Sequence, residues 1–420
     1  MTTTPPRTAR PAAQPDGARG GVAASRIRLG GLFRAESADY YLLLGTTLFL
    51  TVFGLVMVMS SSVVESRLED GGFLVQAGRQ GVYALIGVPM MLVASRFPQR
   101  AWELVAWPML AFSSFLQLLV VATPMGVEVG GNTNWLALGP IPPFQPSEMI
   151  KVALVIWLGT IVTRKQHQLT DFVHGLLPIL LVGGTAIGLV LIGGDLGTVV
   201  IMSTMLLGAL FLIGVRLRLL AIPVVVGVIV FAMVGVSSES RLTRITSFFN
   251  EQCTTIDVDG CWQIQHGMFA LANGGVFGVG LGNSAAKWSW LPAADNDFIF
   301  AIVGEELGLI GAIVVIGMFV VLAIALTRVL RHAVTPFGRA SSAAVLVWVV
   351  GQACVNIAVV LKLLPVLGVP LPLVSAGGTA LLTTLVAIGI ALSISRQSAL
   401  AASGAGRSTR GSRRTGKTAR

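Results

Sequence analysis

Charge is what this sequence has least of, since Asp, Glu, Lys and Arg make up only 11% of its 420 residues. A typical soluble domain carries about 25% charged residues. Hydrophobic residues account for 54% of the chain, and the mean hydropathy is +0.82. So little charge cannot cover a water-facing surface, which excludes an ordinary soluble globular domain. We therefore predict an all-α polytopic protein whose main solvent is lipid.

Long apolar runs recur along the chain and define the expected membrane spans. About 20 apolar residues are needed to cross about 30 Å of hydrocarbon. We expect about ten transmembrane helices, at residues 42–61, 80–96, 102–122, 147–163, 172–193, 196–214, 219–236, 298–326, 340–361 and 377–395. No cleavable signal peptide is expected, because residues 1–39 are polar and low in complexity, and the first span acts as its own anchor.

The net charge of +10 reflects topology rather than nucleic-acid binding. Most of the 29 Lys and Arg residues fall in alternate loops and in the two ends of the chain. This positive-inside asymmetry predicts cytoplasmic termini, an even number of spans and one large extracytoplasmic loop between helices 7 and 8. The chain then divides into a disordered basic tail at 1–39, a membrane domain at 40–396 with its outer loop at 237–296, and a basic tail at 397–420. That last tail is either a solvated anchor near anionic headgroups or a docking site for a cytoplasmic partner.

Cysteine and histidine are scarce, at three and four residues. Cys253 and Cys261 lie in the predicted outer loop, where an oxidising compartment favours a disulfide between them. Cys354 lies inside a span and is expected to be an inert small hydrophobe. The four histidines show no clustered spacing, which argues against a zinc site, and His266 is expected to be a polar loop residue.

The segment at 362–376 interrupts the apolar pattern with three prolines, which no continuous helix accommodates. Non-helical backbone at membrane depth has to face protein or a wet cavity. Two interpretations follow from the residues: this segment forms the wall of a cavity, or it is a surface loop with turn-forming prolines.

Ionisable residues at or inside apolar spans are costly and usually functional. Asp297 opens the eighth span at the expected water–lipid boundary, either as a functional carboxylate or as a helix N-cap. Glu305 and Glu306 follow roughly 12–13 Å deeper in the same helix, too far to form an acid–base pair with Asp297. They are expected to be buried structural charges or part of a second polar network.

A second group of charges lies in the fourth span and in the turn between the fifth and sixth. Glu148 and Lys151 share one helix face at a spacing of three residues. A buried lysine needs a counter-charge, and Asp195 is in a position to supply it across the bundle. Lys151 either stabilises the bundle or binds a phosphate. Arg241, Arg244 and Lys287 in the outer loop, with Lys362 at an outer helix end, are either solvated cations or a binding site for an anionic headgroup.

Six segments together resemble the SEDS family (shape, elongation, division and sporulation) of polytopic glycan polymerases, in its order and spacing, over about residues 40–396. They are QPSEMIK at 145–151, GGDLGT at 193–198, TRITSFFN at 243–250, GVGLGNSAAK at 278–287, DFIFAIVGEELG at 297–308 and PLPLVSAGG at 370–378. GLGNS followed by lysine, and IVGEELG, are more similar to the division branch, typified by FtsW, than to the elongation branch, typified by RodA.

The resemblance implies a peptidoglycan glycosyltransferase. Such an enzyme polymerises lipid II, the undecaprenyl-pyrophosphate-linked disaccharide-peptide, at the outer face of the bacterial cytoplasmic membrane, here at the division septum. The family's essential carboxylate falls on Asp297, expected to act as general base, and its buried polar cluster falls on Glu148, Lys151 and Asp195. The residues expected to bind substrate are Arg241, Arg244, Lys287, Lys151 and Ser375.

The expected partners and cofactors follow from the same resemblance. The partners are a class B penicillin-binding protein (a transpeptidase), other division proteins and membrane lipids, with no nucleic acid. The resemblance does not specify a cofactor. The leaving diphosphate is stabilised either by cationic side chains or by a divalent cation, Mg²⁺ or Mn²⁺. Three other interpretations are open: a flippase for lipid-linked precursors, a polymerase of the elongation branch, and an inert scaffold.

The sequence departs from the family pattern directly before Asp297. The usual PEAHTD reads PAADND at residues 292–297, so that Ala293 and Asp295 replace the customary glutamate and histidine. A second carboxylate therefore stands two residues from Asp297, at the position of the usual histidine.

Overall fold

The computed structural model describes residues 36–68, 75–129, 132–139, 141–236, 242, 248, 259–285 and 295–415. In this part of the chain a helix lies at each of the ten expected ranges, and one more lies in the predicted outer loop. The helices are α1 (Ala38–Leu68), α2 (Val75–Ala94), α3 (Gln99–Ala122), α4 (Pro146–Lys165), α5 (Leu177–Ile192, after one π-helical turn at Phe172–Leu176), α6 (Leu196–Leu212), α7 (Leu217–Val236), α9 (Asp259–Gly274), α10 (Ile299–His332), α11 (Pro336–Val360) and α12 (Gly378–Thr415).

The apolar helices confirm a polytopic, mainly α-helical membrane protein. Eight of the helices in the described residues are long and apolar enough to cross a membrane. Helix α6 is apolar but shorter, because Asp195 caps its start and Gly214 follows its end with a φ of 98°. The total of ten spans stays a prediction. Helix α12 continues to Thr415, beyond residue 396, where the sequence predicts the start of a basic tail.

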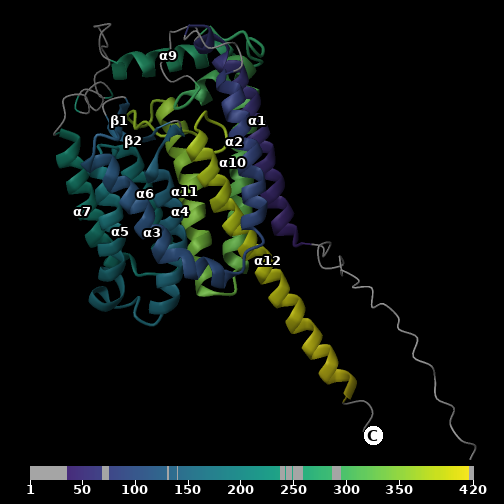
Figure 1. Ribbon diagram of the computed structural model, residues 1–420. Helices are drawn as coiled ribbons and strands as arrows, with labels where there is room; N and C mark the ends of the chain where they lie inside the picture. The colour runs from purple at the N-terminus through teal and green to yellow at the C-terminus, as the bar shows by residue number, and fades with distance from the viewer. Residues whose placement is uncertain are drawn as a thin grey trace, which may run out of the picture. The chain divides into compact units, whose positions relative to one another are not determined.

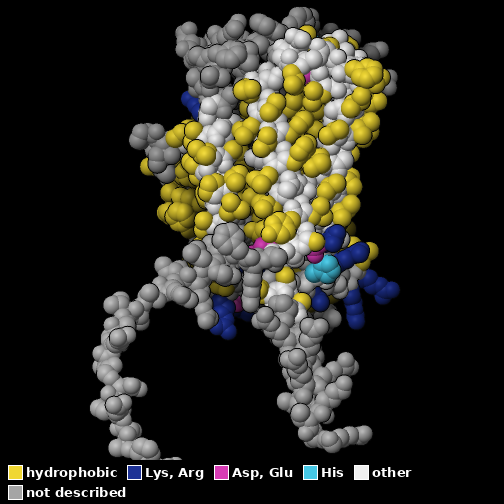
Figure 2. All heavy atoms as spheres, turned by 90° about the vertical axis from the view of Figure 1, so that its right-hand side faces the viewer, with side chains coloured by type: hydrophobic (Ala, Val, Ile, Leu, Met, Phe, Trp, Pro, Cys, Tyr) yellow, Lys and Arg dark blue, Asp and Glu magenta, His cyan; other side chains and the backbone are white. Residues whose placement is uncertain are grey.

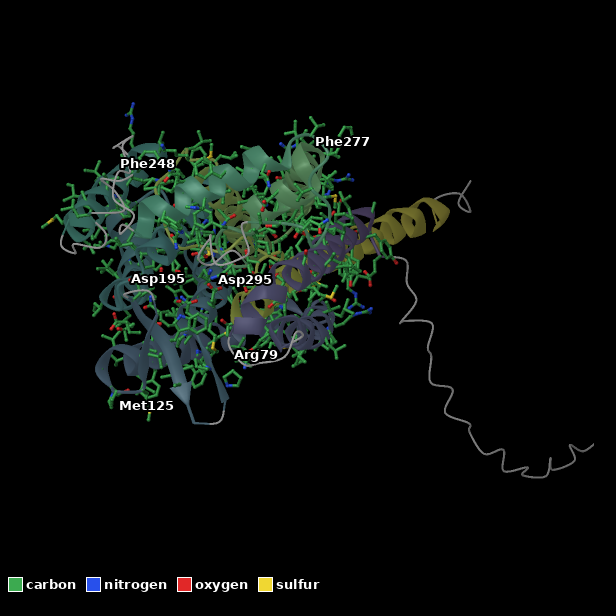
Figure 3. All side chains as sticks on the ribbon, turned by 90° about the horizontal axis from the view of Figure 1, so that it is seen from above. Arg79, Met125, Asp195, Phe248, Phe277 and Asp295 are labelled. Carbon is green, nitrogen blue, oxygen red and sulfur yellow. The ribbon has the colours of Figure 1, made fainter. Side chains whose placement is uncertain are left out.

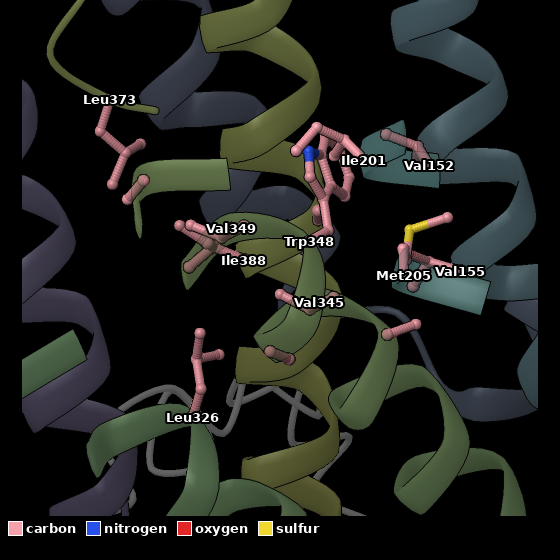
Figure 4. Close-up of a cluster of buried hydrophobic side chains, with 14 of the residues drawn as sticks. Val152, Val155, Ile201, Met205, Leu326, Val345, Trp348, Val349, Leu373 and Ile388 are labelled. Atoms are coloured by element: carbon pink, nitrogen blue, oxygen red, sulfur yellow. The ribbon is translucent and has the colours of Figure 1, made fainter. Parts of the chain in front are cut away.

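Helices α4 and α11 form the centre of the bundle (Figure 1). Helix α11 packs against α4, α6 and α10, while α4 also packs against α3 and α12. The apolar stretch of α4 is 83% buried inside the bundle, whereas that of α7 is only 6% buried. Helix α7 therefore lies at the periphery. The side chain of Trp348 on α11 is completely buried among residues of α4 and α6, including Val152 and Met205 (Figure 4).

Among the described residues, Lys and Arg side chains gather at one end of the bundle (Figure 2). Figure 2 shows a broad band of hydrophobic side chains, with Lys, Arg and His side chains gathered at its lower end. There Asp39 Oδ1 pairs with Arg328 Nε at 2.7 Å, and His332 Nδ1 lies 2.6 Å from Asp39 Oδ2. Glu36 pairs with Arg396 at 3.1 Å. We call this the basic end; the positive-inside rule predicts that it faces the cytoplasm.

The opposite end carries a small antiparallel sheet in the order β1 (Gly126–Val129), β2 (Asn132–Leu138) and β3 (Ile141–Phe144). The sequence analysis predicted no strand here. Proline is tolerated in an edge strand, which is where Pro142 and Pro143 lie. The completely buried Leu136 of β2 packs against α3, and Thr133 N donates to Gly193 O at 3.0 Å. We call this the sheet end.

Several expectations lie outside the described residues. These are the structure of residues 1–35, the charges Arg241, Arg244 and Lys287, and the pairing of Cys253 with Cys261, whose side chain is also not described. The disulfide and the division of the chain into a membrane domain and two tails therefore stay predictions.

Candidate active site

The proline-containing segment after α11 enters the bundle. Residues 361–377 form neither helix nor strand, and Leu371 and Val374 are almost completely buried. The backbone of Leu373 and Val374 lies so close to Gly54 of α1 that a side chain at Gly54 would overlap it. We call residues 361–377 the broken segment: residues 361–364 are exposed, while Val366, Val369 and residues 371–375 are buried inside the bundle rather than in a surface loop.

Three amide side chains satisfy carbonyl groups of the broken segment. Gln352 Nε2 donates to Pro370 O at 2.8 Å, and Asn356 Nδ2 donates to Val369 O at 2.8 Å, both from α11. Gln80 Nε2 of α2 donates to Ser375 O at 3.1 Å. Buried backbone without such partners would be costly, so these amides stabilise the interruption.

The broken segment in turn holds residues 295–297, the turn that leads into α10. The backbone N of Ala376 donates to Asp295 O at 2.9 Å. The Ser375 hydroxyl donates to Asn296 O at 2.6 Å, and Asn356 Nδ2 donates to Asp297 O at 2.8 Å. Every carbonyl group of this turn is therefore fixed by a group from α11 or the broken segment.

The side chain of Asp297 is half-buried at the sheet end of the bundle. The N-cap residue of α10 is Phe298, with no side-chain capping bond, so Asp297 does not occupy the cap position. Gly368, at a φ of 67°, borders the carboxylate: a Cβ atom there would lie 3.7 Å from Asp297 Oδ2. Asp295 is buried two residues earlier.

The buried lysine is neutralised within its own helix. Lys151 Nζ lies 2.7 Å from Glu148 Oε1, and both side chains are almost completely buried. Lys151 Nζ also donates to Gln352 Oε1 at 3.2 Å and lies 4.9 Å from the centroid of the Trp348 ring. Thr383 of α12 donates to Glu148 Oε2 at 3.1 Å. Because Gln352 also binds the broken segment, this cluster is linked to the candidate site.

Asp195 does not form the ion pair with Lys151 that the sequence analysis expected. Its carboxylate accepts hydrogen bonds from Thr198 N at 2.9 Å and from Gln145 Nε2 at 3.0 Å, and so caps α6. Glu148 takes the expected role because a spacing of three residues places it beside Lys151. Burial of Asp195 in the turn between α5 and α6 raises the pKa of its carboxyl, against the hydrogen bonds with Thr198, which lower it.

Glu305 and Glu306 belong to a separate polar network. Glu305 accepts hydrogen bonds from Asn273 Nδ2 at 3.0 Å and from the Ser284 hydroxyl. Glu306 accepts a hydrogen bond from the Ser60 hydroxyl at 2.6 Å. Both glutamates thus hold the stretch at 275–285, which leads toward Lys287, against α10 and α1. Of the five residues predicted to have a structural polar role, Glu148, Lys151 and Asp195 lie in the candidate-site half of the bundle, while Glu305 and Glu306 form the second polar network that the sequence allowed.

The described residues contain no group of three or more His, Cys, Asp or Glu side chains that could hold a metal ion. His266 lies in α9 rather than in a loop; its Nδ1 lies 3.0 Å from Trp262 O and its ring stacks on that of Trp262.

Among the predicted substrate-binding residues, Ser375 lies at the candidate site and Lys151 in the buried cluster. The sequence analysis missed Gln80, Gln352 and Asn356; the available signal was their position as amides in apolar helices.

Comparison with known proteins gives a consistent family match. Residues 40–400 match the model of the FTSW_RODA_SPOVE family, described as cell cycle proteins. A protein of Mycobacterium tuberculosis named probable peptidoglycan glycosyltransferase FtsW is 36% identical over 389 residues, covering 92% of this chain and 74% of that protein. A protein of the same name from Geobacter sulfurreducens is 37% identical over 348 residues, covering 82% of this chain and 92% of the relative.

Two solved structures share the fold. A chain from a structure titled as a peptidoglycan synthase complex that coordinates polymerization and crosslinking superposes with a TM-score of 0.66 and 22% identity. The match covers 85% of this chain and 97% of that one. The rod shape determining protein RodA of Thermus thermophilus gives a TM-score of 0.62 at 22% identity, covering 87% and 98%.

Proposed function

We propose, since the chain belongs to the FTSW_RODA_SPOVE family of cell cycle proteins, that it is a peptidoglycan glycosyltransferase of the division branch. In this proposal it polymerises lipid II on the outer side of the bacterial cytoplasmic membrane, at the septum. The relatives described above carry the name of such an enzyme. Their identity to this chain over most of its length supports the transfer of that activity.

Asp297 is the proposed general base. The acceptor hydroxyl oxygen attacks the anomeric carbon of the donor sugar, and the bond from this carbon to the diphosphate oxygen breaks. The proton of the hydroxyl passes to the Asp297 carboxylate, and the diphosphate leaves with the electron pair of the broken bond. Diphosphate is a good leaving group and needs no general acid to protonate it, so a single carboxylate, acting as base, suffices. General-base assistance of this kind is worth about 10²–10⁴-fold in rate, or about 3–5 kcal/mol.

The observation that carries this role is the way the turn before α10 is held. Asn356 and Ser375 fix the carbonyl groups of Asp297 and Asn296, while the Asp297 side chain stays half-buried at the sheet end. A base must stay within hydrogen-bond reach of the proton it removes, and a fixed backbone limits how far the carboxylate moves.

The leaving diphosphate needs positive charge. Arg241, Arg244 and Lys287 are the proposed side chains, because they belong to the outer loop that ends directly before Asp297. A bound Mg²⁺ or Mn²⁺ is the alternative source. Polymerisation by the purified protein with and without a chelator separates the two: full activity in the chelator favours the side chains.

A precursor flippase would need charged groups along an open path through the bilayer. The described charges do not favour this function, because Lys151 and Glu148 are paired with each other and enclosed. Glu305 and Glu306 instead hold the stretch at 275–285. A class B penicillin-binding protein is the proposed partner, supported by the structural likeness to a chain from a peptidoglycan synthase complex.

The first prediction tests the base. Asp297→Asn keeps the size of the side chain but removes its charge and basicity, so it should insert and fold normally and make no glycan polymer from lipid II. The matched control is Glu128→Gln, the same change at an exposed residue of the sheet end, which should polymerise like the parent protein. Polymer from Asp297→Asn at the parent rate would exclude the base role.

A further inference from the structure

A cavity of about 340 Å³ lies at the sheet end, between α2, the small sheet and the start of α12. Arg79 and Tyr83 of α2 form one wall, and Trp135 of β2 stands in another. The third wall is the end of the broken segment, at Ala376 and Gly377. Of the substrate-binding residues expected from the sequence, Lys151 and Ser375 lie in the described part of the chain, and neither lines this cavity.

The cavity shares a wall with the turn that carries the proposed base. Ala376 lines the cavity and donates its backbone N–H to Asp295 O. Gln80 also lines the cavity and donates to Ser375 O. In the view from above (Figure 3), Asp295 lies toward the middle of the bundle and Arg79 nearer its rim. A ligand in the cavity therefore contacts the same backbone that holds the turn.

The groups that face the cavity combine one cation with two aromatic rings. Arg79 is exposed, and no carboxylate of the described residues forms an ion pair with it. A guanidinium matches the oxygens of a phosphate group in pairs. Tyr83 and Trp135 are half-buried and present flat apolar faces with one polar group each, which suits the apolar face of a sugar ring. Tyr83 lies directly against Gly378, where any side chain would overlap its ring.

The position of the cavity also fits a ligand with a lipid tail. On the turn of α2 that follows Arg79, Val82 and Leu85 are exposed, at 54% and 75%, on the apolar band of the bundle. A lipid chain lying along this face would place its headgroup near Arg79 without leaving the membrane.

We propose that this cavity binds the diphosphate and first sugar of a lipid-linked substrate, with Arg79 on the diphosphate and with Trp135 and Tyr83 on the sugar. This inference rests on the proposed function, because a lipid diphosphate sugar is the substrate of that reaction. It adds Arg79 and the sheet to the substrate-binding groups, beside the loop cations predicted from the sequence.

Equilibrium binding without turnover tests the site. The full-length protein carries Asp297→Asn so that no polymer forms, and the probes are lipid II and undecaprenyl diphosphate in detergent. Arg79→Gln should weaken binding of both probes about tenfold or more, and Arg79→Lys should weaken it less. Trp135→Leu should weaken binding of lipid II and leave that of undecaprenyl diphosphate unchanged.

Glu128→Gln is the matched control, because Glu128 is an exposed charge at the sheet end that does not line the cavity, and its removal changes the net charge by the same amount. It should change either dissociation constant less than twofold. A gain of affinity in Glu128→Gln as large as the loss in Arg79→Gln would overturn the site in favour of general attraction between charges. Parent affinity in Arg79→Gln, with an unchanged melting temperature, would also overturn it.

The two proposals fail in different ways. If the parent protein makes no polymer from lipid II, the proposed function fails, while the binding measurements still decide whether Arg79 holds a diphosphate. If the parent polymerises normally and Arg79→Gln binds and polymerises like it, the cavity assignment fails and the proposed function stands.

Discussion

At the scale of single residues, the ion pair of Lys151 and Glu148 is costly to bury, because both charged side chains lie inside the bundle. Each charge has lost nearly all contact with solvent and depends on the other and on a few polar neighbours. Removing one member of such a pair leaves the other buried without compensation, which typically costs 3–5 kcal/mol. The same linkage through Gln352 to the broken segment means that a change here reaches the candidate site.

Lys151→Met should therefore lower the melting temperature of the purified protein strongly and lower polymerisation with it. Adding Glu148→Gln, which keeps an oxygen for Thr383, should restore most of the stability because no charge is then left unpaired. Thermal unfolding in detergent measures both. Parent stability in Lys151→Met together with lost activity would instead assign Lys151 to substrate binding, the alternative that the sequence left open.

At the scale of elements, the broken segment and the turn before α10 act as one unit, and Asn356 connects them. Its amide donates to Val369 O in one element and to Asp297 O in the other. Asn356→Leu keeps the volume and removes both bonds, so the turn loses one of its three fixed carbonyl groups.

The expected result for Asn356→Leu is a fall in kcat of about 100-fold with a much smaller change in KM, because a displaced base affects the reaction more than binding. The control is Ser341→Ala in the same helix, which removes one buried hydrogen bond, to Val155 O, nearer the basic end. If Asn356→Leu kept the kcat of the parent protein, or if Ser341→Ala lost as much kcat as Asn356→Leu, a positioning role for Asn356 would be contradicted.

The elements also show what the sequence could and could not predict. Apolar length and proline placement predicted helices at all ten ranges and the interruption after α11, because burial in lipid leaves few alternatives for the backbone. The small sheet was missed because its strands are short, contain prolines and are stabilised by contact with α3 and Gly193 rather than by their own pattern. Lys151 was given the wrong partner because both carboxylates were compatible with the sequence, and only packing decides between them.

At the scale of the whole molecule, the chemistry depends on which end of the bundle faces outward. Asp297, the sheet and the cavity with Arg79 lie at one end, and the ion pairs of Asp39 and Glu36 lie at the other. The excess of Lys and Arg at the basic end predicts that it faces the cytoplasm, which places Asp297 outside.

Labelling of single cysteines tests this orientation in a variant without Cys253, Cys261 and Cys354. Met125→Cys lies at an exposed position of the sheet end, and Gln166→Cys at an exposed position between α4 and α5 at the basic end. A membrane-impermeant maleimide should label Met125→Cys in intact cells and Gln166→Cys only after the membrane is opened. The reverse pattern would put Asp297 on the cytoplasmic side, where no external glycan strand is within its reach, and would contradict polymerisation at the outer face whatever the purified protein does in detergent.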